Sequence, residues 1–161
     1  MRPLTLLESV ASVSILGSVI AVFIPAFASN LHASRLSEPL DGLKHIGARA
    51  SALADERPAS DAYPPSVGLT PSSVPSGVSV EDAEGTWEHP TWKLLEFRQP
   101  SLHYYAFSFQ SENRPTGSSF VARAHGDLDG DGVFSNFEIR GSKRSGEDAS
   151  LSHVSMDREI E

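Results

Sequence analysis

The sequence predicts an α+β fold in which a long N-terminal helix, membrane-spanning in its first half, packs on a small antiparallel β-sheet head. Two observations predict this fold. No formal charge interrupts the apolar run from Ser9 to Leu31, which as a helix would extend about 34 Å, enough to cross the hydrocarbon core of a bilayer. After Trp87, aromatic and β-branched residues gather in segments with the partial alternation typical of strands.

Composition excludes several classes of function. The chain has 161 residues, a formal net charge of -8 and 13 scattered Lys and Arg residues, so no basic stripe offers a face for nucleic acid. It contains no cysteine, which excludes disulfides, thiolate catalysis and Cys-based zinc sites.

Patterning divides the chain into six segments. Apolar residues at a three-to-four spacing predict that the helix continues past the apolar run, and the Pro- and Ser-rich stretch after it predicts a loop. The expected strands are Leu102–Phe109, Ser119–Ala124 and Phe134–Ile139. The segments are a short leader-like segment (1–3), a transmembrane or filament-core helix (4–30), its amphipathic continuation (31–54), the Pro/Ser-rich loop (55–86), the antiparallel β head with an Asp-rich loop (87–141) and a polar, partly disordered tail (142–161).

The N-terminal residues carry a resemblance to a known family. The segment Leu4-Thr5-Leu6-Leu7-Glu8, followed by Gly17 and Pro25, resembles the N-terminus of type IV pilins and pseudopilins. The resemblance implies that Leu4 begins the mature chain and that Glu8 compensates the free amine of a neighbouring subunit during assembly, because a paired buried carboxylate costs far less than a lone one. Family precursors are cut after a Gly, whereas Pro3 stands before Leu4 here.

This resemblance implies a function, partners and a location. The function is that of a structural subunit of a type IV pilus-like (fimbrial) or type II secretion pseudopilus-like filament, held in the membrane by its N-terminal helix before assembly. The implied partners are copies of itself, other pilin-like subunits, prepilin peptidase and an inner-membrane assembly platform. The implied location is the bacterial inner membrane, as a single-pass protein with its C-terminal head outside the cytoplasm, and afterwards a periplasmic or cell-surface filament.

Two other interpretations of the N-terminal segment remain open. One is a secretory signal peptide with Ala26-Phe27-Ala28 as its small-residue cleavage site. Cleavage there would release a secreted calcium-binding module beginning near Ser29. The other is an ordinary single-span anchor, although the small residues of the segment suit contacts between helices better than contacts with lipid.

One motif carries recognisable chemistry. Residues 127–138 match the calcium-loop pattern D-x-[DN]-x-[DN]-G-x₅-E in full. Such a loop surrounds a hard cation with oxygens, while its glycines permit the sharp turn. The strand-like flanks indicate an EF-hand-like loop that joins two strands and binds structural Ca²⁺, and the alternative is a plain acidic turn. The predicted ligands are Asp127, Asp129, Asp131, the carbonyl of Val133, Ser135 and Glu138, with Gly130 and Gly132 providing the loop geometry.

Motifs of catalysis are not recognisable in the sequence. The six histidines form no zinc-binding spacing, and the chain contains no nucleophile elbow, phosphate-binding loop or dinucleotide fingerprint. We therefore expect a protein that is not an enzyme and has no catalytic residues. The alternative is a membrane-anchored hydrolase whose active site is assembled only in the folded chain.

Overall fold

The computed structural model describes residues 14, 18, 21, 35–99 and 101–157. It divides the chain into two compact units, Met1–Leu36 and Ser37–Glu161. In the first unit, Ser14, Ser18 and Ala21 have helical conformation, and the Ser18 hydroxyl donates a hydrogen bond to the Ser14 carbonyl at 2.9 Å. The second unit contains the sheet and all the sites considered below.

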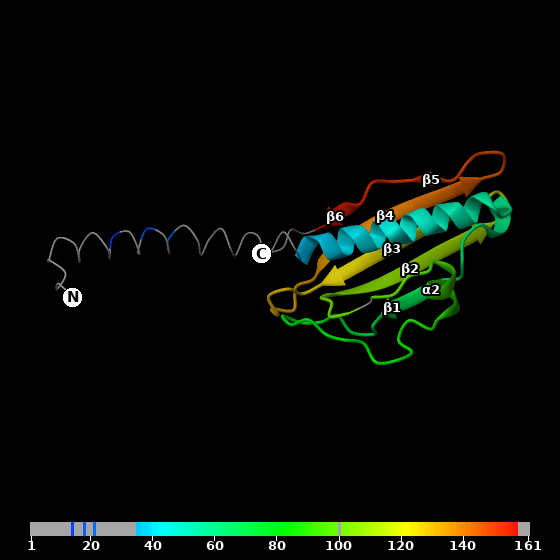
Figure 1. Ribbon diagram of the computed structural model, residues 1–161. Coiled ribbons are helices and arrows are strands. Elements are labelled where there is room, and N and C mark those ends of the chain that lie inside the picture. Colours follow the sequence, from blue (N-terminus) through cyan, green and yellow to red (C-terminus); the bar gives the residue numbers. More distant parts are fainter. Residues whose placement is uncertain (1–13, 15–17, 19–20, 22–34, 100, 158–161) are drawn as a thin grey trace, which may run out of the picture. The chain divides into compact units, whose positions relative to one another are not determined.

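A six-stranded antiparallel sheet dominates the second unit (Figure 1). Five strands follow the order β1-β2-β3-β4-β5, and β6 also pairs with β4. The central β2, β3 and β4 have ten residues each, so their main-chain hydrogen bonds form the body of the sheet. The strands are β1 (Val67–Thr70), β2 (Tyr105–Arg114), β3 (Gly117–Gly126), β4 (Ser135–Arg144), β5 (Ser150–Leu151) and β6 (Ser155–Asp157).

The side chains of β3 explain how the sheet buries one of its faces. Burial alternates along this strand, with Phe120, Ala122 and Ala124 buried. Cross-strand neighbours in an antiparallel pair point to the same face, so Ala124 shares that face with Phe107 of β2 and Phe137 of β4. Small residues in the middle strand leave room for a covering element between the larger side chains of its neighbours.

That covering element is a helix over residues 35–55, called the long helix here, which lies along the sheet (Figure 1). Its buried residues recur at helical spacing and are Pro39, Leu43, Ile46, Gly47, Ala50 and Ala54. Two glycines allow close approach: a Cβ at Gly42 would lie 2.7 Å from the Phe107 ring, and one at Gly47 would lie 2.8 Å from Ile139 Cδ1.

A cluster of aromatic rings extends the core beside the long helix. The short helix α2 (Pro90–Leu94) carries Trp92, whose ring lies 5.4 Å from that of Trp87 and 5.5 Å from that of Phe97. Phe97 in turn packs edge-on against Phe107 of β2 at 4.9 Å. The Trp92 indole N–H donates to Thr70 Oγ1 at 3.0 Å, which ties α2 to β1.

The predicted fold class is wrong about the relative sizes of the helix and the sheet. The protein is mostly a six-stranded antiparallel sheet, and the described residues contain one helix of seven residues or more, over residues 35–55, rather than a long N-terminal helix on a small sheet. The three expected strand segments overlap β2, β3 and β4. The additional strands are two to four residues long. Because strands this short are held by a few main-chain hydrogen bonds to their neighbours, amino-acid composition does not reveal them.

The predicted membrane span is also corrected. Within the described part of the chain, no helix combines the length and the apolar character needed to cross a bilayer. The expectation of a single-pass protein of the inner membrane, and its description as a transmembrane protein, are therefore withdrawn. Most of the apolar run from Ser9 to Leu31 lies outside the described residues.

The C-terminal segment adds strands where the sequence predicts a polar tail. β5 pairs Leu151 with Gly141, and β6 pairs Met156 with Phe137, so both strands extend the β4 side of the sheet. Ahead of β1, the Pro/Ser-rich segment also contains a 3-10 helix (Ala59–Asp61). Because these short pieces join strands that are already paired, tertiary contacts rather than local propensity decide their conformation.

Candidate calcium-binding loop

The Asp-rich loop occupies residues 127–134, between the end of β3 and the start of β4. The hairpin register pairs Gly126 with Ser135, which holds the two ends of the loop together. Asp127 is buried and Leu128 is 7% exposed, so the first turn of the loop is anchored in the domain. Asp129 and Asp131 are exposed, which leaves the outer side of the loop open to solvent.

Three carboxylates of this loop converge. Asp127, Asp129 and Asp131 each offer an oxygen, and these oxygens lie within 4.8 Å of one another. Within the described ranges this is the only group of three or more potential metal ligands. Like charges at this separation repel one another, and a hard divalent cation with oxygen ligands would neutralise that repulsion. The residues present therefore fit a Ca²⁺ ion.

Glycines at two loop positions make this convergence sterically accessible. Gly130 has φ +80° and Gly132 has φ +86°, both in the left-handed region that L-residues with a Cβ disfavour. Across each glycine an aspartate forms a local turn: the Asp131 N–H donates to Asp129 Oδ1 at 3.1 Å, and the Val133 N–H donates to Asp131 Oδ1 at 2.6 Å. The loop geometry predicted for the two glycines is thus the geometry observed.

Asp127 is held by contacts from inside and outside the loop. Its Oδ1 accepts from the Gly130 N–H at 2.8 Å, and its Oδ2 accepts from the Gly132 N–H at 3.2 Å. From the distant Pro/Ser-rich segment, the Ser76 hydroxyl donates to Oδ2 at 2.8 Å and the Gly77 N–H donates to the Asp127 carbonyl at 2.8 Å. The Ser76 bond, with the backbone donors, lowers the pKa of Asp127 despite the opposing effect of burial.

Sequence patterning offers no signal for Ser76 and Gly77 as part of this site. They lie in a stretch of Ser, Pro and Gly residues and precede Asp127 by about fifty positions. A parallel bridge between Ser76 and Asp127 brings the two segments together, and only the folded chain creates that contact.

Of the remaining predicted ligands, Glu138 lies outside the cluster of the three aspartates. Glu138 is three residues into β4, where its carboxylate forms ion pairs with Arg123, at 2.8 Å, and with Arg140. Burial is the largest single influence on the pKa of Glu138 and acts to raise it. The hydrogen bonds and positive charges of Arg140 and Arg123 together outweigh burial, so the pKa of Glu138 is lowered. The Ser135 hydroxyl donates to the Gly126 carbonyl at 3.2 Å, and Val133 is exposed.

The reason for the position of Glu138 is the extended backbone that follows the loop. In an EF-hand, a helix brings the twelfth residue back toward the ion. A strand instead advances about 3.4 Å per residue, so Glu138 lies about 10 Å further along β4 than Ser135. The carboxylates that the structure brings together are therefore those of the three aspartates.

The residues predicted to act in assembly, Leu4, Glu8, Gly17 and Pro25, lie outside the described residues.

Comparisons with known proteins give no family for this chain: no family model, no curated protein and no solved structure matches it. The description of the chain as a prepilin is corrected together with the membrane span, because no pilin family model matches.

Proposed function

We propose that this protein is a non-catalytic structural subunit of a filament of the type IV pilus or pseudopilus kind, with a sheet domain whose β3–β4 loop binds Ca²⁺. The observation that carries the proposal is the N-terminal pattern from Leu4 to Glu8, with Gly17 and Pro25 at the spacing of that family. In this function Glu8 pairs with the N-terminal amine of a neighbouring copy. The partners are copies of the chain and related subunits.

Two features of the sheet domain support a structural role. The long helix buries one face against the sheet, and within the described part of the chain Asp41, Lys44 and Ala48 on its other face are exposed, which suits contact with neighbouring copies. In addition, the buried imidazole of His103 has both ring nitrogens engaged, with the Tyr105 carbonyl and the Asp82 carboxylate, each at 2.9 Å. With both ring nitrogens occupied by protein groups and the side chain buried, His103 has neither nitrogen available to a molecule from outside.

Calcium fits this role as a structural ion. A chain without cysteine cannot cross-link an exposed domain with disulfides, and a cation that binds only the folded loop stabilises the folded state. In the same role, the ion would hold the β3–β4 hairpin in a single geometry on the filament surface.

The test is filament assembly by the full chain with Glu8 replaced. In Glu8→Ala we expect filaments, counted by negative-stain electron microscopy, to disappear while the circular dichroism and melting temperature of the sheet domain stay unchanged. The matched control is Glu56→Ala, an exposed acidic residue just after the long helix, which should assemble normally. Normal filaments in Glu8→Ala would overturn the proposed pairing.

A second candidate function is a secreted calcium-binding module that begins near Ser29. It is favoured by the division of the chain into two compact units, because Ser37–Glu161 contains the whole sheet and the Asp-rich loop. Mass spectrometry of the native N-terminus separates the candidates. A chain that retains Glu8 supports the filament, whereas a chain that starts near Ser29 supports the secreted module.

A further inference from the structure

The sheet has a second face, on the side opposite the long helix, and this face carries polar side chains. Because successive strand residues point to opposite faces, the neighbours of the buried Ala122, Ala124 and Ile139 project there. They are Val121, Arg123 and His125 of β3 and Asn136, Glu138, Arg140 and Ser142 of β4. We call this surface the polar sheet face.

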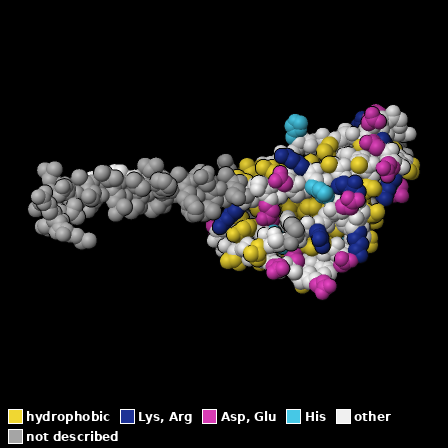
Figure 2. Space-filling model, viewed as in Figure 1, with side chains coloured by type: hydrophobic (Ala, Val, Ile, Leu, Met, Phe, Trp, Pro, Cys, Tyr) yellow, Lys and Arg dark blue, Asp and Glu magenta, His cyan; other side chains and the backbone are white. Residues whose placement is uncertain are grey.

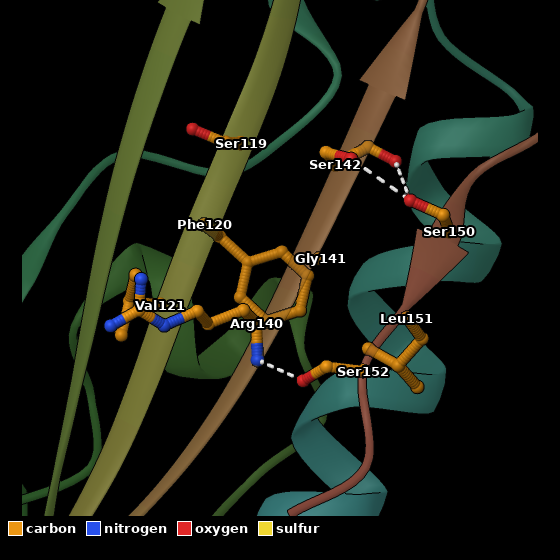
Figure 3. Close-up of a pocket in the computed structure, with 9 residues that line it drawn as sticks. All are labelled: Ser119, Phe120, Val121, Arg140, Gly141, Ser142, Ser150, Leu151 and Ser152. Atoms are coloured by element: carbon orange, nitrogen blue, oxygen red, sulfur yellow. Dashed lines mark hydrogen bonds between the residues drawn. The ribbon is translucent and has the colours of Figure 1, made fainter.

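Three adjoining hollows run along the polar sheet face. Their volumes are about 480, 420 and 310 Å³. Figure 3 shows the largest one, where the Arg140 side chain extends from β4 across β3 and the β5 segment forms one wall. That wall is fastened to β4 by the Ser142–Ser150 hydroxyl contact at 2.9 Å and by the Arg140 N–H, which donates to Ser152 Oγ at 3.0 Å.

The charge of these hollows is opposite to that of the whole chain. Four basic and two acidic residues on this face line them, in a protein with 13 basic and 21 acidic residues. On the surface over the long helix, by contrast, Figure 2 shows basic and acidic side chains interspersed.

Ion pairs leave a net positive charge on the polar sheet face. Glu138 is shared by Arg123 and Arg140, so one of these two positive charges is not balanced. One further basic residue at this end, Arg114, is paired with Glu112. Arg144 forms no ion pair with any residue that the structure describes. Arg140 and Arg144 both point to this face from β4, about 14 Å apart along the strand.

A complementary acidic segment lies elsewhere on the same chain. Residues 81–88 contain four acidic residues and no Lys or Arg. Asp82 is occupied by His103 and Glu88 by Lys93, whereas Glu81 and Glu84 are exposed and form no ion pair within the described part of the chain. The acidic segment comes directly after Val80, which forms a bridge with His103 just ahead of β2. The hollows instead lie along β3 and β4, on a different part of the domain.

We propose that the polar sheet face binds the acidic segment of a second copy of this chain, with Arg140 and Arg144 facing Glu81 and Glu84. Such a contact is heterologous, because it joins two different surfaces, and heterologous contacts repeat into open assemblies unless the rotation closes a ring. Surface ion pairs are individually weak. A contact built from them needs a high local concentration of neighbouring copies, which filament assembly supplies. In this respect the contact rests on the proposed function.

The absence of native cysteine allows a direct test with the full-length chain. One copy carries Ser119→Cys, an exposed position in the largest hollow, and the other carries Ala83→Cys, between the two glutamates. We expect a mixed disulfide to form under mild oxidation at low salt and to form about tenfold more slowly near 1 M salt, where charges are screened beyond about 3 Å. The matched control replaces Ser119→Cys by Ala52→Cys, which is exposed on the long helix.

Charge reversal then tests the pairing itself. Arg140→Glu with Arg144→Glu in the Ser119→Cys copy should slow the mixed disulfide about tenfold, and Glu81→Lys with Glu84→Lys in the Ala83→Cys copy should restore it. The melting temperature of each variant checks its fold. The contact would be overturned if the mixed disulfide formed no faster than in the Ala52 control. It would also be overturned if neither charge reversal changed the rate of disulfide formation.

The outcome for the contact is distinguishable from the outcome for the filament. A charge-dependent mixed disulfide in a chain that never forms filaments supports the contact and refutes the proposed function. Filaments that form without this disulfide overturn the contact and leave the proposed function standing.

Discussion

Glu38 of the long helix accepts a hydrogen bond from the backbone N–H of Tyr105 at 3.0 Å, across 67 positions of sequence. The same carboxylate accepts from the Tyr104 N–H at 3.1 Å. One side chain thus fastens the long helix to the start of β2. Burial raises the pKa of Glu38, although both backbone donors oppose that rise.

Removal of this anchor should destabilise the domain. For Glu38→Ala we expect the free energy of unfolding to fall by about 1–3 kcal/mol, because two backbone donors lose their charged acceptor. Glu38→Gln keeps one acceptor oxygen and should lose less. Urea denaturation followed by tryptophan fluorescence measures both, and an Ala variant as stable as the wild type would contradict the anchor.

The raised pKa of Glu38 predicts a pH dependence with a definite sign. A group whose folded pKa exceeds its unfolded value contributes stability that is present at low pH and is lost as pH rises through the folded pKa. The wild type should therefore gain stability relative to Glu38→Gln as pH falls from 7 toward 4.5. The comparison with Gln is needed because Glu138 and Asp127, whose pKa values are lowered, lose their contributions as pH falls.

Calcium should raise the melting temperature of the protein. Binding to the folded loop alone contributes about 2.7 kcal/mol when free Ca²⁺ is about 100 times its Kd. Mg²⁺ should have a smaller effect, since it demands octahedral geometry and gives up water reluctantly. Differential scanning calorimetry after chelation and after Ca²⁺ addition measures the shift, and identical melting curves would show that the loop is an acidic turn.

Two variants of the loop should separate ion binding from folding. Asp129 is exposed, so Asp129→Asn should leave the calcium-free melting temperature almost unchanged and weaken the response to Ca²⁺. Asp127 accepts bonds from Ser76, Gly130 and Gly132, so Asp127→Asn should lower the melting temperature even after chelation. Equal behaviour of the two variants would contradict this division of roles.

Gly42 should tolerate no side chain. A Cβ there would lie 2.7 Å from the buried Phe107 ring, and overpacking of this kind costs about 1–3 kcal/mol. This exceeds the gain of at most about 1 kcal/mol that Ala has over Gly in a helix, so Gly42→Ala should destabilise. The matched control is Gly68→Ala on β1, where a Cβ would meet nothing within 4 Å, and chemical denaturation compares the two.

Glu96 has a left-handed backbone conformation, which costs less free energy for glycine than for a residue with a Cβ. It follows α2 with φ +49°, and the bonds from the Glu96 N–H to the Lys93 carbonyl and from the Phe97 N–H to the Trp92 carbonyl form a Schellman cap. Glu96→Gly should be about 1 kcal/mol more stable than Glu96→Ala, since both variants lose the exposed Arg49 ion pair. Thermal melting of the pair tests this difference.

The local sequence pattern predicted those features whose residues are neighbours both in the sequence and in space. Alternation located the segments that overlap β2, β3 and β4, and the Asp and Gly spacing located a loop in which Asp127, Asp129 and Asp131 converge. These features depend on contacts within about five residues, so the order of residue types is enough to specify them.

The tertiary structure alone decided the edge strands, the partner of Glu138 and the contact between Ser76 and Asp127. Each depends on which distant segment lies opposite, as when Arg123 pairs with Glu138 across the register of β3 and β4. A glutamate at the twelfth loop position satisfies the calcium pattern equally well on a helix or a strand. Only the extended backbone of β4, which carries that carboxylate away from the aspartates toward two arginines, determined where it acts.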